Sequence, residues 1–111
     1  EQISELNVIV GREFAAAAHM VCREAKISLS SIDLIGSHGQ TIFHHSSLRG
    51  KLGSTLQIGD GDVIAEATGR PVVSDFRMRD IAAGGEGAPL TPYADAILYG
   101  AKLHPERAIL N

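Results

Sequence analysis

Charged side chains and glycines gather in one stretch of the second half of this chain. A short β-branched run at 72–73 is followed by Asp75, Arg77 and Asp80. Three glycines come directly after them, Gly84, Gly85 and Gly87. Charged groups are costly to bury unless they are paired, and glycine lets a backbone approach a ligand closely or adopt a positive φ. The stretch therefore predicts a polar ligand held at the end of a strand.

The three charged residues of this stretch allow more than one role. Arg77 could pair with a neighbouring carboxylate, the cluster could clamp a substrate, or it could take part in acid–base chemistry. A structural ion pair at a strand end is the simplest alternative. The adjacent glycines favour a ligand site, because charged clusters in clefts mark functional sites more often than chance would.

A second polar cluster, Ser-His-Gly-Gln-Thr at 37–41, follows an apolar run at 32–36 that reads as a short buried strand. In open α/β sheets, ligands lie beyond the carboxyl ends of strands, where this cluster falls. Gln and Thr side chains can donate and accept hydrogen bonds at once, as a sugar hydroxyl requires. The alternative is a polar turn that satisfies its own backbone.

Metal and hydrolase chemistry have weaker support. A zinc site could draw on His38, His44 and His45, but the chain has no HExxH and no second cysteine, so we expect no metal site. A triad of Ser37, His38 and Asp33 lacks the G-x-S-x-G elbow.

The glycine-rich stretch at 84–87 could cradle phosphate through its backbone N–H groups. It matches neither G-x-x-x-x-G-K-[ST] nor G-x-G-x-x-G, and no lysine lies nearby in the sequence. A plain glycine-rich bend is the alternative, and nucleotide binding by this loop alone is poorly supported.

The elements that must position these clusters alternate between helix and strand. Apolar spacings of three and four residues predict a helix over 3–26, and Asp60 or Asp62 can cap a second helix that ends at Thr68 before Gly69. The remaining expectations are strands at 32–36, 56–58 and 72–73, a loop over 44–54, a helix over 93–99 and a strand beginning at 108. This order is that of an α/β domain.

Composition narrows the class of protein. The chain has 111 residues, 44% of them hydrophobic, and a net charge of −3, which argues against a nucleic-acid partner. No apolar run reaches membrane-spanning length. The single cysteine, Cys22, excludes an internal disulfide, fits a reducing compartment and reads as a buried structural thiol. The chain starts at Glu1 and stops at Asn111 just after an apolar run, so we expect a piece of a longer protein.

Four motifs together resemble the anhydro-N-acetylmuramic acid kinase family. They are IGSHGQT at 35–41, LQIG at 56–59, DFRMRD at 75–80 and GGEGAPL at 84–90. Their order, spacing and identity agree with the family across roughly residues 32–95, and the segment from Leu6 to Ala18 resembles the helix that precedes this core. Glu86 is a departure, because the family usually has Gln there.

The resemblance implies a fold and an activity. The fold would be an incomplete α/β domain of an actin/hexokinase-like (ribonuclease H-like) kinase, with residues 1–111 forming one partial domain on the sugar side of the first lobe. The activity would be a cytoplasmic transferase of peptidoglycan recycling and amino-sugar metabolism. With ATP, Mg²⁺ and water, it would convert 1,6-anhydro-N-acetylmuramic acid to N-acetylmuramic acid 6-phosphate.

The resemblance also implies roles for particular residues. The best candidates for shaping the sugar pocket are Ser37, His38, Gln40, Thr41, Arg77 and Asp80, with Gly84, Gly85 and Gly87 near the ligand. The family's phosphate loop would precede Glu1 and its catalytic base would lie beyond Asn111, so we expect the 111 residues alone to be inactive.

Other functions stay open on the sequence. The chain could belong to a different sugar kinase of the same superfold, or to a sugar-binding or interaction module without catalysis. We expect an amino sugar and ATP as partners and neither nucleic acid nor membrane, and a homo-oligomer is compatible with the sequence.

Overall fold

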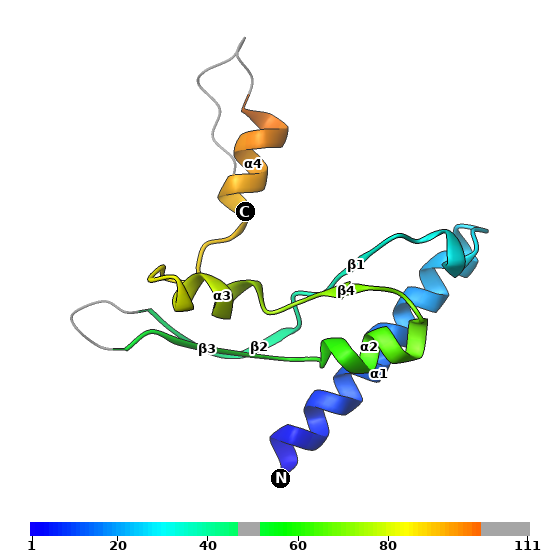
Figure 1. Ribbon diagram of the computed structural model, residues 1–111, viewed down its shortest axis with the longest axis horizontal. Coiled ribbons are helices and arrows are strands. Elements are labelled where there is room, and N and C mark those ends of the chain that lie inside the picture. The colour runs from blue at the N-terminus through cyan, green and yellow to red at the C-terminus, as the bar shows by residue number, and fades with distance from the viewer. Residues whose placement is uncertain (47–51, 101–111) are drawn as a thin grey trace.

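A computed structural model describes residues 1–46 and 52–100 of the chain. Helices and strands are mixed along it (Figure 1), which confirms the predicted α/β class. The elements are α1 (Gln2–Glu24), η1 (Leu29–Ser31), β1 (Ile35–Gly36), β2 (Gln40–His45), β3 (Ser54–Ile58), α2 (Gly61–Thr68), β4 (Val72–Val73), α3 (Phe76–Ala82) and α4 (Thr91–Tyr99). None of the helices in these described ranges is both long and apolar enough to cross a bilayer.

Strands β1 and β4 form a short parallel pair. Ile35 lies opposite Val72, and Gly36 lies opposite Val73. The N–H of Ile35 donates to the carbonyl of Pro71 at 2.9 Å, and the N–H of Ser37 donates to that of Val73 at 2.9 Å. Because the strands are parallel, their carboxyl ends leave the pair side by side. The polar residues that follow each strand are therefore neighbours.

Strands β2 and β3 form an antiparallel hairpin, so the prediction for this region was partly wrong. Residues 40–41 were expected in a turn and 44–45 in a loop, but all four belong to β2. The β-branched and aromatic residues that precede His44 favour an extended chain. The register shifts between Thr41 and Phe43, which marks a bulge at Ile42. The strand predicted over 32–36 is shorter than expected, because the 3-10 turn η1 precedes it and only residues 35–36 pair.

Helix α2 follows its predicted capping signals. The side chain of Asp60 accepts hydrogen bonds from the N–H groups of Asp62 at 3.0 Å and Val63 at 3.1 Å. The helix ends at Thr68, and Gly69 follows with a φ of 64° in the left-handed region. The predicted boundaries of this helix are confirmed.

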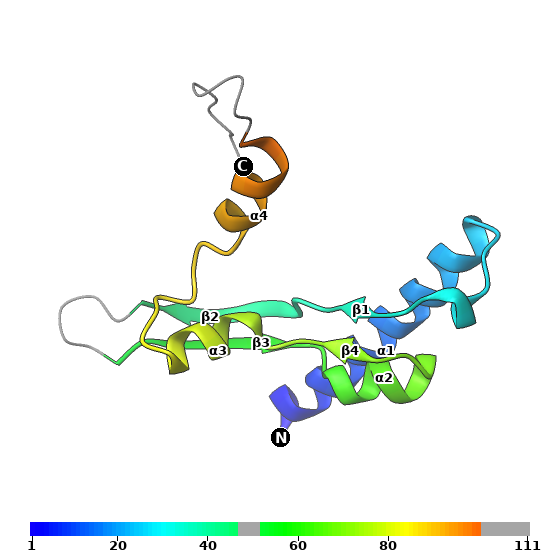
Figure 2. The ribbon, with the colours of Figure 1, turned by 45° about the horizontal axis from the view of Figure 1, so that its top comes forward.

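Helix α1 packs closely against α2 and the turn before it (Figure 2). A Cβ atom on Gly11 would lie 3.0 Å from the carbonyl oxygen of Asp60, so a larger residue would push against this backbone. On the other side of the same contact, a Cβ atom on Gly59, in the turn before α2, would lie 2.7 Å from Cε2 of Phe14 on α1. The buried apolar residues of the described ranges include Ala15, Cys22, Ile58 and Ile64, which confirms a buried thiol at Cys22.

Helix α3 was not predicted. Asp75 adopts a φ of 59°, and this left-handed turn redirects the chain from β4 straight into α3. Arg77 and Asp80 consequently lie on a helix rather than at a strand end. Helix α4 begins two residues before the predicted start at 93, because proline fits the first turn of a helix. The strand expected from 108 lies outside the described residues.

Asn7 joins α1 to the turn between β3 and α2. Its Oδ1 accepts a hydrogen bond from the N–H of Gly59 at 2.8 Å, and its Nδ2 donates to Oδ2 of Asp60 at 3.0 Å. One amide side chain thus satisfies a backbone donor and orients the carboxylate that caps α2.

We predict that Asn7→Ala destabilises the full-length protein that carries this segment. The change leaves the Gly59 N–H and one carboxylate oxygen of Asp60 without their partner, which should lower the free energy of unfolding by about 1–3 kcal/mol. Urea unfolding measures the loss. Glu13→Ala is the control, because Glu13 lies exposed on the same helix, and it should change stability by no more than about 0.5 kcal/mol. Equal stabilities of the two variants would contradict the bridging role of Asn7.

Candidate functional site

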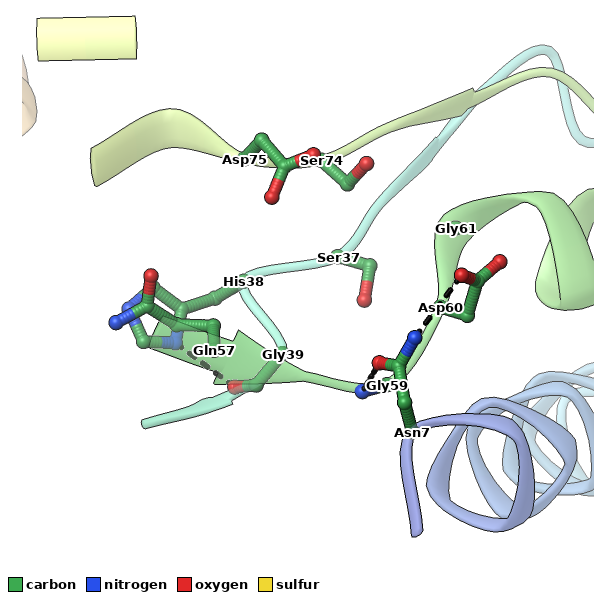
Figure 3. A pocket seen from close by; sticks show the side chains of 10 residues that line it. All are labelled: Asn7, Ser37, His38, Gly39, Gln57, Gly59, Asp60, Gly61, Ser74 and Asp75. Atoms are coloured by element: carbon green, nitrogen blue, oxygen red, sulfur yellow. Dashed lines mark hydrogen bonds between the residues drawn. The ribbon is translucent and has the colours of Figure 1, made fainter. Parts of the chain in front are cut away.

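A polar pocket of about 130 Å³ lies where β1, β3 and β4 end (Figure 3). Its walls come from α1, from the turns after the three strands, and from the start of α2. The lining residues are Asn7, Ser37, His38, Gly39, Gln57, Gly59, Asp60, Gly61, Ser74 and Asp75. All of them are polar residues or glycines, so the pocket suits a ligand that makes hydrogen bonds.

Ser37, a largely buried residue, supplies a hydroxyl to this pocket. Its exposed fraction is 8%, and its side chain points into the pocket in Figure 3. The backbone N–H of Ser37 is used in the β1–β4 pair, but its hydroxyl makes no hydrogen bond to the described residues. A hydroxyl that faces the pocket without a protein partner is available to a ligand.

The charged side chains that line the pocket are the carboxylates of Asp60 and Asp75. The Asp60 carboxylate is already occupied by α2 and Asn7. A carboxylate accepts hydrogen bonds and repels anions, so this pocket favours hydroxyl or amide N–H groups of a ligand over its phosphate or carboxylate groups.

Two side chains of helix α3 bind the backbone of the glycine loop, residues 84–87. Both contacts are made to Gly87. Arg77 donates from Nη1 to the carbonyl oxygen of Gly87 at 2.8 Å. Asp80 accepts a hydrogen bond from the N–H of Gly87 at 2.7 Å through Oδ2. The hydrogen bonds of Arg77 therefore go to the loop and to His38 rather than to the neighbouring aspartates, which were the expected partners in a structural ion pair.

His38 connects the polar turn after β1 to α3. Its Nδ1 lies 2.9 Å from the carbonyl oxygen of Gly39, an acceptor, so Nδ1 carries the proton of that contact. The other nitrogen, Nε2, then accepts a hydrogen bond from Nε of Arg77 at 2.8 Å. The neutral ring thus joins the pocket wall to the helix that holds the glycine loop.

The glycine loop does not offer its N–H groups to a phosphate. The N–H of Gly84 donates to the carbonyl of Ile81, and the N–H of Gly85 donates to the carbonyl of Asp80, both at 2.9 Å. The N–H of Gly87 is taken by the Asp80 carboxylate. These bonds favour the interpretation of the loop as a structural bend over a phosphate cradle.

The structure separates the predicted site residues into three groups. Ser37 and His38 line the pocket. Gln40 and Thr41 lie on β2 outside its lining, where Gln57 donates to Oγ1 of Thr41 at 3.0 Å. The third group holds or forms the loop beside α3: Arg77, Asp80, Gly84, Gly85 and Gly87.

Sequence reasoning missed several lining residues. Ser74 directly follows β4, so the strand-end rule that selected Ser37 would also have found it. Asn7 and Gln57 carry no such local signal, because each reaches the pocket only through tertiary packing. Across 1–46 and 52–100, no three His, Cys, Asp or Glu side chains gather as metal ligands, and His44 instead lies with Nδ1 3.2 Å from Oγ1 of Thr55.

Comparison with known proteins identifies close relatives. A sequence model of the anhydro-N-acetylmuramic acid kinase family matches residues 1–111. A Bacillus cereus (strain ATCC 10987 / NRS 248) protein of that name is 54% identical over 98 residues, which cover 87% of this chain and 26% of that protein. A protein of the same name from Bacillus anthracis (strain CDC 684 / NRRL 3495) shows the same 54% identity and coverage. The chain thus spans about a quarter of the length of these curated relatives.

We predict that Asp80→Ala frees the glycine loop. The Gly87 N–H loses a charge-assisted acceptor, and such hydrogen bonds are worth about 1.5–3 kcal/mol. Hydrogen–deuterium exchange of the full-length protein should therefore speed up roughly 10- to 100-fold at 84–87. Arg79→Ala is the control, because Arg79 lies on the same helix and makes no side-chain hydrogen bond within the described ranges. Unchanged exchange in Asp80→Ala would show that Asp80 does not hold the loop.

Proposed function

This chain belongs to the anhydro-N-acetylmuramic acid kinase family, and from that premise we propose that it forms the sugar-binding part of an ATP-dependent amino-sugar kinase. The whole enzyme uses ATP and water to open the 1,6-anhydro bridge of anhydro-N-acetylmuramic acid and to phosphorylate O6. The product is N-acetylmuramic acid 6-phosphate, and the reaction serves cell-wall recycling in the cytoplasm.

The hydroxyl of Ser37, which faces the pocket, is the observation that carries this proposal. It lies within the motif at 35–41, beyond the carboxyl end of β1, and points into a pocket lined by polar groups. A sugar presents hydroxyl and amide groups that both donate and accept, and the lining offers matching groups at Ser37, Ser74 and Asp75. The location agrees with the general place of ligands in open α/β sheets.

We assign the sugar, rather than the nucleotide, to this segment. The N–H groups of Gly84, Gly85 and Gly87 are bonded to α3, so the loop is poorly suited to hold the phosphates of ATP. ATP supplies the transferred phosphoryl group and Mg²⁺ compensates its charge, and both bind elsewhere in the proposed enzyme. Arg77 and Asp80 act here by holding the loop beside the pocket.

The proposal includes a fold for the whole enzyme. The parallel β1–β4 pair, with α2 packed against β4 and α1 packed against α2, supports part of one lobe of an actin/hexokinase-like, ribonuclease H-like kinase. In such a fold two α/β domains close over a cleft, and this segment supplies the sugar side of the first lobe. The partners of the enzyme are then a small amino sugar and ATP.

We predict that Ser37→Ala in the full-length enzyme raises the KM for anhydro-N-acetylmuramic acid roughly 3- to 10-fold, the loss of one neutral hydrogen bond. The KM for ATP should stay unchanged, because the pocket binds the sugar alone. Steady-state ADP release with each substrate varied in turn measures both constants. Ser31→Ala, a change in the exposed turn η1, should alter neither.

Two results would count against the proposal. A changed KM for ATP in Ser37→Ala would indicate that this pocket binds the nucleotide. A wild-type enzyme that phosphorylates another sugar but not the anhydro sugar would instead favour a different specificity within the same superfold.

A further inference from the structure

Asp75 occupies the position of a helix cap but does not act as one. It is the residue before α3, yet its side chain accepts no hydrogen bond from the first turn of that helix. Asp60 stands at the same position before α2, and its carboxylate accepts from the N–H groups of Asp62 and Val63. A cap is the usual use of aspartate at this position. The carboxylate of Asp75 is therefore available to accept a hydrogen bond from a ligand.

The backbone of Asp75 is held in an unusual conformation. Its φ of 59° and ψ of 33° lie in the left-handed region, which is uncommon for residues other than glycine and which aspartate tolerates better than most. Such conformations cost free energy and gather at functional sites. Here the conformation leaves the carboxylate on the pocket side of the strand end, facing the turn that carries Ser37 (Figure 3).

The surroundings of this carboxylate indicate what it would bind. Ser37 is 8% exposed as a residue, and its hydroxyl, which faces the pocket, has no protein hydrogen-bond partner in the described part of the chain. Ser74 adds a second hydroxyl from the end of β4. A carboxylate only accepts, whereas a serine hydroxyl can also donate. Asp75 and Ser37 together match a ligand hydroxyl, which donates to the one and accepts from the other.

We propose that Asp75 is a further substrate-binding residue, which accepts a hydrogen bond from a hydroxyl or amide N–H of the sugar. This inference rests on the proposed function and adds an orientation to it. Anhydro-N-acetylmuramic acid carries a carboxylate on its lactyl group, and two carboxylates repel each other at close range. The sugar therefore binds with its hydroxyl or amide groups toward Asp75 and its lactyl carboxylate directed away.

Asp75→Gly in the full-length enzyme tests the proposal without a penalty on the backbone. Glycine adopts a φ of 59° freely, so the variant should fold at least as well as the wild type. Isothermal titration should show affinity for anhydro-N-acetylmuramic acid reduced roughly 10- to 100-fold, the range for a charge-assisted hydrogen bond. The melting temperature should be equal or higher, and affinity for Mg-ATP should be unchanged.

Lys26→Gly is the matched control. Lys26 is the other non-glycine residue with a positive φ in the described ranges, at 56°, and it lies outside the pocket. Its replacement relieves the same kind of strain, so it should leave affinity for the sugar unchanged. A purely structural role for Asp75 would make the two variants alike.

A second pair of measurements tests the orientation. Asp75→Asn keeps the shape of the side chain and removes its charge. It should weaken binding of anhydro-N-acetylmuramic acid and of 1,6-anhydro-N-acetylglucosamine, which lacks the lactyl group, by similar factors. Tighter binding of the acidic sugar alone would show that Asp75 faces the lactyl carboxylate and would overturn the orientation.

The remaining outcomes separate this inference from the proposed function. Unchanged sugar affinity in Asp75→Gly, with a wild-type enzyme that binds the anhydro sugar, overturns the role of Asp75 alone. A wild-type enzyme that does not bind the anhydro sugar overturns the proposed function, and the inference that rests on it falls as well.

Discussion

The parallel pairing of β1 with β4 is the constraint on which the pocket depends. Only two residues of each strand pair, and the N–H of Ser37 completes the ladder by donating to the carbonyl of Val73. This bond fixes the turn after β1 beside Ser74. A slip of one residue would turn every side chain of β4 to the opposite face of the sheet, and the two serines would no longer share a pocket. The placement of the site therefore follows from a few backbone hydrogen bonds.

The charged residues at the start of and along helix α3 have different roles. Arg77 and Asp80 satisfy the two backbone groups of Gly87, so their charges serve the glycine loop. His38 connects Arg77 back to the turn after β1. Asp75, at the start of the helix, is not drawn into these contacts. The stretch that looks like one charged cluster in the sequence thus has two parts. Arg77 and Asp80 hold the glycine loop, and the Asp75 side chain makes no hydrogen bond to these described residues.

Elements with strong local signals were predictable, and those decided by neighbouring segments were not. Helix α2 was found because an aspartate cap and a glycine stop bracket eight residues. Helix α3 has only seven residues, which mix charged and apolar types, and its start has no side-chain cap. The sequence therefore gives no helical signal there. Strand β2 was hidden in the same way, since its polar residues read as a turn until β3 pairs with them.

The candidate site follows the same division. Ser37 was predictable because it directly follows an apolar run that predicts a strand, and His38 comes next, although the strand itself is only half-buried at Ile35 and exposed at Gly36. The role of Asn7 depends on contact between α1 and a turn that lies far along the chain. No pattern near Asn7 indicates this contact. The partner of Arg77 was also beyond sequence reasoning, because the fold offered it a histidine and a carbonyl in place of the nearer aspartates.

The close fit between α1 and the turn before α2 has a consequence for recombination between family members. Gly11 makes room for the carbonyl of Asp60, and Gly59 makes room for the ring of Phe14, so each surface contains the space that the other requires. A chimera that took α1 from one homologue and residues 57–63 from another would combine two surfaces shaped for different partners. We therefore expect a well-folded chimera to take both segments from the same homologue, even though more than thirty residues, from 25 to 56, separate them in the sequence.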